Sequence, residues 1–152
     1  MERFPLLPED YDLVKAACEK VKKPVIHFSG AHRPAPVAAA LRLDNGEIFT
    51  AVNLKADVAS LSVCAEPMII GEARQRTDRK IDTIVAVYFQ DKEGFEPRVI
   101  PPCGRCRELM TDFTKDGMVI MREPHSDVLF RVRARDLLPF KYADYWQEKV
   151  LL

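Results

Sequence analysis

The chain has 152 residues, of which 47% are hydrophobic and 30% charged, and its 23 basic side chains balance 23 acidic ones. This length suits a single domain over residues 1–152 with its own core, and the zero net charge excludes nucleic-acid or membrane binding driven by bulk charge. We expect a cytoplasmic protein, because no signal peptide and no bilayer-length apolar run is evident. In that reducing compartment, four cysteines favour metal binding or redox chemistry over disulfides.

The first half of the chain predicts a helix followed by a β-hairpin. Glu9–Lys22 carries apolar side chains at helical spacing, which predicts an amphipathic helix with Cys18 packed in the core. Val37–Leu43 and Glu47–Asn53 are apolar runs typical of strands. Because the Asp44-Asn45-Gly46 sequence between them is a tight-turn signal, we expect the two runs to pair as a hairpin.

The second half predicts two more helices, three strands and a helical tail. We expect the helices at Cys64–Arg76 and Cys103–Thr114 and the strands at Ile81–Phe89, Val119–Arg122 and Val128–Val132. The first of these helices is expected to bury Ala65, Met68, Ile69 and Ala73. The charged segment Gln90–Val99 predicts a loop, and the tail from Arg135 predicts a helix interrupted at Pro139. Helices alternating with strands predict an α/β fold, a three-layer α/β/α sandwich with a mixed sheet of roughly five strands.

Two short motifs begin two of the predicted helices: Cys64-Ala65-Glu66 and Pro102-Cys103-Gly104-Arg105-Cys106. Cys103 and Cys106 are three residues apart, so their sulfurs lie on one side of a helical turn, as two ligands of one zinc ion must. A helix N-terminus also favours the thiolate form that binds metal. With Cys64 they make three protein ligands, and a catalytic zinc site has three and leaves the fourth position for water. Glu66 lies close enough in sequence to accept a proton from that water.

Each half of this pattern has another interpretation. The Cys103 and Cys106 pair also suits a thiol–disulfide redox protein, although redox chemistry would leave Cys64 and Glu66 unexplained. Cys64 alone could be a small core residue, and Glu66 alone could be a first-turn residue favoured by the helix dipole. A zinc-bearing binding protein without turnover is a third alternative.

Other residues with binding chemistry lack a comparable pattern. His27, His32 and His125 do not have metal-ligand spacing, and we expect them in loops or at the surface. Three aromatic residues near the end could close a pocket, on a neighbouring subunit for example, or pack on the core of their own chain: Tyr142, Tyr145 and Trp146.

The motifs resemble the cytidine deaminase superfamily and, within it, the small cytidine and blasticidin S deaminases. The resemblance runs from about Pro36 to Tyr142 and includes Asp44-Asn45-Gly46, Phe49-Thr50-Ala51-Val52-Asn53 and Leu137-Leu138-Pro139 beside the cysteine motifs. It implies that Cys64, Cys103 and Cys106 hold zinc and that Glu66 moves protons between the water, the ring nitrogen and the departing ammonia. It further implies substrate contacts from Asn53 and from the backbone at Ala65. A homotetramer or dimer whose active sites share residues between chains is also implied.

The sequence departs from the cytidine deaminase pattern at three positions that bear on the substrate. Lys55 stands where a sugar-binding Glu is usual, Ala35 stands about where an aromatic residue stacks on the pyrimidine, and Pro67 replaces an Arg. Three thiolates on zinc leave a net negative charge, and Arg105, Arg107 and the helix dipoles are the remaining groups to offset it. We therefore expect hydrolytic deamination of a small cytosine-like nucleoside or amino-heterocycle, with blasticidin S or a modified cytidine favoured over ordinary cytidine.

Overall fold

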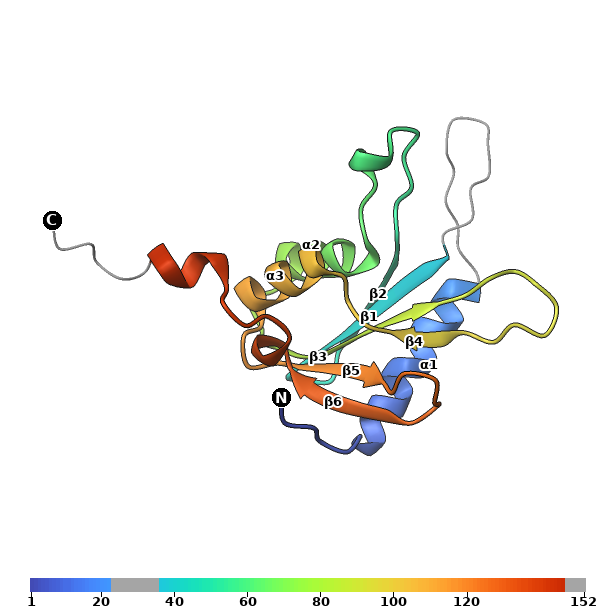
Figure 1. Cartoon of the computed structure of the whole chain (residues 1–152), viewed down its shortest axis with the longest axis horizontal. Coiled ribbons are helices and arrows are strands. Elements are labelled where there is room, and N and C mark those ends of the chain that lie inside the picture. Colours follow the sequence, from blue (N-terminus) through green and yellow to red (C-terminus); the bar gives the residue numbers. More distant parts are fainter. Residues whose placement is uncertain (23–35, 147–152) are drawn as a thin grey trace, which may run out of the picture.

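A six-stranded mixed sheet forms the centre of the computed structural model, which describes residues 1–22 and 36–146 (Figure 1). Its strands are β1 (Val37–Leu43), β2 (Ile48–Val52), β3 (Ile81–Tyr88), β4 (Arg98–Ile100), β5 (Met118–Arg122) and β6 (Leu129–Arg133). The order is β2-β1-β3-β5-β6, with β4 beside β3, and the β3–β5 pair is parallel while the others are antiparallel. The assignment of 1–152 to one domain stays a prediction.

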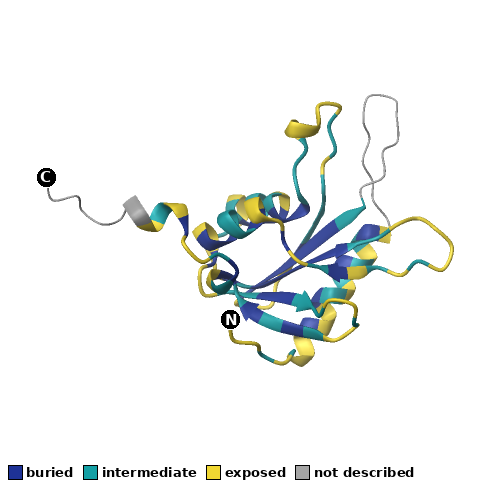
Figure 2. Cartoon of the chain, viewed as in Figure 1, coloured by how far each residue is buried: buried dark blue, intermediate teal, exposed yellow. Residues whose placement is uncertain are grey.

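Helices cover both faces of this sheet, which confirms the predicted three-layer α/β/α sandwich. Helix α1 (Pro8–Lys22) packs on one face, and α2 (Ala65–Arg76) and α3 (Gly104–Phe113) pack on the other. Figure 2 shows the resulting pattern, with buried residues concentrated in the sheet and exposed residues on the outer helix surfaces and loops. Two hydrophobic cores therefore share one sheet.

Strand β1 supplies side chains to both cores. Ala38 and Ala40 lie in the core under α1, whereas Ala39 and Leu41 lie in the core under α2 and α3. This alternation follows from the period of two residues in a strand. All four side chains are fully buried, so β1 is covered on both faces and reads as a continuous apolar run.

The predicted hairpin is confirmed, and it positions Asn53, one of the predicted substrate-binding residues. Gly46 has a φ of 88°, a left-handed conformation that glycine adopts without steric cost, and its N–H donates to the Leu43 carbonyl at 3.0 Å. The register of the hairpin then sets Asn53 beside Val37, where the Asn53 N–H donates to the Val37 carbonyl at 2.9 Å.

The sheet has one strand more than expected, because β4 begins inside the predicted loop Gln90–Val99. Val99 and Ile100 are β-branched residues suited to a strand, and Val99 is buried where it pairs with Val87. The charged residues before Pro97 hid this short strand. It carries the chain along β3 to the point where α3 begins.

Two further predictions need correction. In α2, Met68 is 39% exposed, whereas Ile70 is buried. The helix contacts both the sheet and α3, so its buried surface is wider than the single apolar stripe that the spacing predicted. The tail forms two 3₁₀ segments, Ala134–Leu137 and Tyr142–Trp146, rather than an α-helix, and the predicted interruption at Pro139 lies between them.

The predictions for the remaining residues have mixed outcomes. His125 is exposed in a turn, as expected, while His27 and His32 lie outside the described residues. Cys18 is half-buried and packs against the core under α1. None of the helices in the described ranges is long and apolar enough to cross a membrane.

Candidate zinc site and active-site cavity

The N-termini of α2 and α3 meet at the cysteine motifs. Cys64 is the residue before α2 and Cys103 the residue before α3, and both have extended backbones that lead into the first helical turn. The Cys64 and Cys103 sulfurs are 3.8 Å apart, and the Cys103 and Cys106 sulfurs are 3.5 Å apart. Two residues 39 positions apart in the sequence thus become neighbours.

The three sulfurs fit a tetrahedral zinc site. With Zn–S bonds of about 2.3 Å, two sulfurs of a tetrahedron lie about 3.8 Å apart. All three sulfurs lie within 4.8 Å of one another, and the described residues hold no second group of this kind. Three thiol ligands leave a fourth coordination position for water, which distinguishes a catalytic from a closed structural zinc site.

Burial and mutual proximity control ionisation of these thiols. Burial raises the pKa of Cys106, and the nearby Glu66 carboxylate raises it further. Burial also raises the pKa of Cys64. Burial opposes ionisation of Cys103 too, but the backbone and side chain of Cys106 outweigh it and lower the pKa of Cys103. A coordinated cation deprotonates such thiols, so zinc uptake by this cluster releases protons and weakens as the pH falls.

Glu66 lies in the first turn of α2, two residues after Cys64, and its side chain is buried. Burial raises the pKa of this carboxyl group, although interactions with its own backbone and with Cys106 partly oppose that effect. A raised pKa makes a carboxylate a better proton acceptor, which suits a general base that later returns the proton as an acid.

A cavity of about 270 Å³ opens beside the sulfurs. Four of the predicted site residues line it, namely Asn53, Cys64, Glu66 and Cys103. Cys106 is fully buried in the first turn of α3. The two remaining predicted site residues, Ala65 and Lys55, both within the described ranges, do not line the cavity. Each lies within two sequence positions of a residue that does.

Sequence reasoning missed five residues that line the cavity: Val37, Ser62, Val63, Ile100 and Pro101. Four of them immediately precede Cys64 or the Pro102-Cys103 motif, so proximity to the cysteines was a usable signal. Val37 had no such signal, because its place depends on strand pairing with the segment that ends at Asn53. These residues make much of the cavity wall apolar, as is usual for small-molecule sites.

The Asn53 side chain has a fixed orientation in this cavity. The side-chain Oδ1 accepts the Val37 N–H at 3.0 Å, and the backbone N–H of Asn53 donates to the Val37 carbonyl. The Val37 bond fixes the rotamer of the side chain, and the Nδ2 group has two N–H donors that could serve a ligand.

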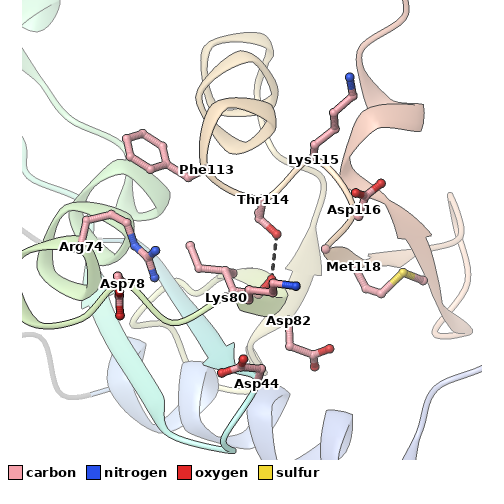
Figure 3. A pocket seen from close by; sticks show the side chains of 12 residues that line it. Asp44, Arg74, Asp78, Lys80, Asp82, Phe113, Thr114, Lys115, Asp116 and Met118 are labelled. Carbon is pink, nitrogen blue, oxygen red and sulfur yellow. Dashed lines mark hydrogen bonds between the residues drawn. The ribbon is translucent and has the colours of Figure 1, made fainter.

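A second cavity, of about 460 Å³, lies at the other ends of α2 and α3 and is lined by charged residues (Figure 3). Three of its carboxylates already form ion pairs within the chain: Asp44 with Arg79, Asp82 with Arg42, and Asp116 with Arg135. Thr114 closes part of the floor by donating to the Ile81 carbonyl at 2.8 Å. These carboxylates are already paired within the chain, and the cavity beside the sulfurs, which holds the predicted site residues, is the better functional candidate.

The mixed sheet, the flanking helices and the three thiols define a zinc-dependent deaminase of the cytidine deaminase fold. A cytidine deaminase from Burkholderia pseudomallei superposes with a TM-score of 0.66 at 26% identity, covering 86% of this chain and 96% of that chain. The cytidine deaminase from Bacillus anthracis superposes with a TM-score of 0.71 over 90% of this chain and 91% of its own, and at 22% identity it shows the fold alone.

A family model for the cytidine and deoxycytidylate deaminase zinc-binding region matches residues 10–122, so the chain belongs to that family. A blasticidin-S deaminase from Bacillus cereus is 35% identical over 144 residues, which are 93% of this chain and 98% of that protein. The predictions of the family, of hydrolytic deaminase chemistry and of zinc as cofactor are thereby confirmed. A thiol–disulfide function is disfavoured, because Cys64 lies as close to Cys103 as a zinc ligand would.

Removing Cys103 should abolish stoichiometric zinc. Cys103→Ala leaves two thiols, too few for the coordination that catalytic zinc requires, whereas Cys18→Ala removes a half-buried thiol on α1 and should retain zinc. Metal content of the purified proteins, measured by elemental analysis, separates the two variants. Full zinc occupancy in Cys103→Ala would contradict the ligand set.

Proposed function

We propose that Cys64, Cys103 and Cys106 hold zinc and that the adjoining cavity binds a cytosine-type ring for hydrolytic deamination. The observation that carries this proposal is the cluster of three thiols within 4.8 Å of one another, two of which line one cavity together with the buried Glu66. Zinc, when bound there, supplies a water whose pKa the metal lowers.

Glu66 then moves protons within the cavity. Its carboxylate accepts a proton from the water and delivers it to the ring nitrogen next to the carbon that carries the amine. A second transfer through the same carboxyl group protonates the amine, which leaves as ammonia while the ring carbon gains the oxygen. The overall change is addition of water and loss of ammonia, so Glu66 returns to its starting state.

Asn53, Ala65 and Lys55 are proposed to bind the substrate. The Nδ2 donors of Asn53, whose Oδ1 is held by Val37, suit an oxygen of a sugar or its equivalent. The N–H of Ala65, the first residue of α2, has no partner within its helix and can donate to a ring carbonyl. Lys55 is included because Leu54 pairs with Val63 in a β-bridge, and in an extended chain residues two positions apart, such as Asn53 and Lys55, share a side.

The substrate is proposed to be a modified cytidine or blasticidin S rather than ordinary cytidine. The similarity to the Bacillus cereus blasticidin-S deaminase supports this choice. Lys55 supports it as well, because a cation in place of a carboxylate favours an anionic or acceptor group on the sugar side of the substrate.

A small molecule is proposed as the partner, with no bulk nucleic acid or membrane surface, since the formal net charge is zero. The reducing cytoplasm is the proposed location, because the cluster depends on free thiols.

A homo-oligomer, a dimer or tetramer, is also proposed. The C-terminal segment extends away from the body of the chain (Figure 1), and Phe140 and Tyr142 are 84% and 71% exposed. Lys141 fixes the start of this segment, because its Nζ contacts Thr111 Oγ1 at 2.7 Å and Asp112 Oδ1 at 2.6 Å on α3. Apolar side chains held outward in this way suit contact with a second copy.

Replacing Glu66 should stop ammonia release while zinc and fold remain. Glu66→Gln keeps the shape of the side chain but cannot carry protons, so kcat should fall by at least about 100-fold. The matched control is Glu72→Gln, farther along α2, which should act like wild type. Ammonia release is measured on cytidine, deoxycytidine, cytosine, 5-substituted cytidines and blasticidin S. Near-wild-type turnover in Glu66→Gln would contradict the assigned role, and zinc without release from any compound would indicate a binding protein.

Changing Asn53 to Asp should weaken substrate binding specifically. The carboxylate that Asn53→Asp introduces still accepts the Val37 N–H, but both side-chain donors are lost, so kcat/KM should fall about 10-fold or more. Asn45→Asp makes the same chemical change in the exposed hairpin turn, where the Asn45 Oδ1 accepts the Glu47 N–H, and should leave kcat/KM unchanged. Equal kinetics for the two variants would argue against a substrate contact by Asn53.

Light scattering should give a mass at least twice the 17.3 kDa of one chain. Combined Phe140→Ser and Tyr142→Ser substitutions should lower that mass, whereas Tyr11→Ser on the exposed side of α1 should not. A wild-type protein that runs as a monomer at all concentrations would rule out the oligomer.

A further inference from the structure

The connection from β4 to α3 has few backbone donors with which to fix its own path. Pro101 and Pro102 have no N–H group, so neither can donate a backbone hydrogen bond. Cys103 itself is exposed, whereas Cys106 is fully buried and held by packing. Contacts other than core packing must therefore hold the Cys103 sulfur in place.

The Cys106 backbone and thiol contact the Cys103 sulfur itself, and Arg107 holds the backbone that carries this sulfur. The Arg107 Nε donates to the Pro102 carbonyl at 2.9 Å, and its backbone N–H donates to the Cys103 carbonyl at 3.0 Å. Arg107 thus holds the carbonyl group before Cys103, which belongs to Pro102, and the carbonyl group of Cys103 itself. Pro102 is buried and Arg107 half-buried, so the side-chain bond is partly shielded from competing water.

The place of Cys103 within the cluster makes this contact consequential. Its sulfur is 3.8 Å from that of Cys64 on α2 and 3.5 Å from that of Cys106 on α3, so it joins the two helices. A shift of Cys103 would change both distances at once, whereas the first turn of α3 would keep Cys106 in position. Arg105, on the same helix, carries the same charge but is exposed.

We propose that Arg107 is a positioning residue of the zinc site, which acts through its hydrogen bond to the Pro102 carbonyl and not through its charge. This inference rests on the proposed zinc ligation by the three cysteines. Groups that orient metal ligands from outside the coordination sphere commonly change metal affinity by about 10- to 100-fold when removed. Arg107 holds the peptide next to a ligand and is expected to act in that range.

The test uses a matched pair of substitutions at Arg107. In Arg107→Gln the amide nitrogen lies the same number of bonds from Cα as the Arg Nε, so the donor stays while the charge is lost. Arg107→Met puts an apolar methyl group at that place, and both residues are good helix formers. Arg105→Met serves as the control, because it removes the same charge from an exposed position on α3.

Zinc affinity is measured for the full chain by competition with a chelator, and the visible absorption of the cobalt-substituted protein reports the geometry of the thiolate ligands. Arg107→Met should lose about 10- to 100-fold in zinc affinity and show an altered cobalt spectrum. Arg107→Gln should stay close to wild type in both measurements, as should Arg105→Met.

Wild-type zinc affinity and an unchanged cobalt spectrum in Arg107→Met would overturn the proposal. A loss of zinc affinity in Arg107→Gln or Arg105→Met equal to that in Arg107→Met would also overturn it, because it would indicate a role of charge. Circular dichroism of the metal-free proteins checks the fold. Should Arg107→Met not fold, Arg107→Gln decides alone, since wild-type affinity supports the proposal and lost affinity overturns it. If the wild-type chain itself binds no zinc, the proposed zinc site fails, and that result is distinct from a failure at Arg107 alone.

Discussion

Three thiols gathered within 4.8 Å of one another, at the starts of two helices, are the constraint on which the site depends. Thiolates this close repel one another, so the scaffold has to hold them and positive charge has to offset them. The two helix N-termini point their positive dipole ends at the cluster. A bound cation then converts the repulsion into coordination. The sheet makes this arrangement possible, because α2 and α3 pack on the same face and begin at the same place.

Burial of Glu66 is the second feature that links stability to function. A carboxyl group taken out of water costs stability as an anion, and its raised pKa expresses that cost. The same shift suits a group that has to accept a proton and give it back. The cavity beside Glu66 has a largely apolar wall, which gives the carboxyl group few polar neighbours.

The residues around the cluster lie on different parts of the fold from the cluster itself. The three cysteines and Glu66 come from the two helix starts, which the sheet and the α2–α3 contact hold. Lys55, by contrast, lies on the connection between β2 and α2, which projects from the body of the chain (Figure 1). Residues on such a connection can change the substrate without disturbing the metal site, because they carry little of the core.

The sequence by itself determined the class of protein. The spacing of Cys103 and Cys106, the Cys64-Ala65-Glu66 motif and the helix starts next to both were readable, because helical geometry relates residues three or four positions apart. The alternation of helices and strands was readable for the same local reason, and it predicted the layers. Three details were not readable locally: the short strand β4 behind a charged segment, the exposure of Met68, and the 3₁₀ form of the tail. Each depends on which neighbour an element packs against.

The tertiary structure decided how distant residues meet. No local rule places Cys64 beside Cys103, 39 positions away, because that contact arises only when both helices pack on one face of the sheet. Strand pairing likewise fixed the Asn53 side chain, through the Val37 N–H that its Oδ1 accepts, at the wall of the cavity. The hydrogen bond from Arg107 to Pro102 became visible only with the turn into α3 in place. Periodicity in a sequence reports the local path of a chain, whereas a site built from several elements depends on the packing that joins them.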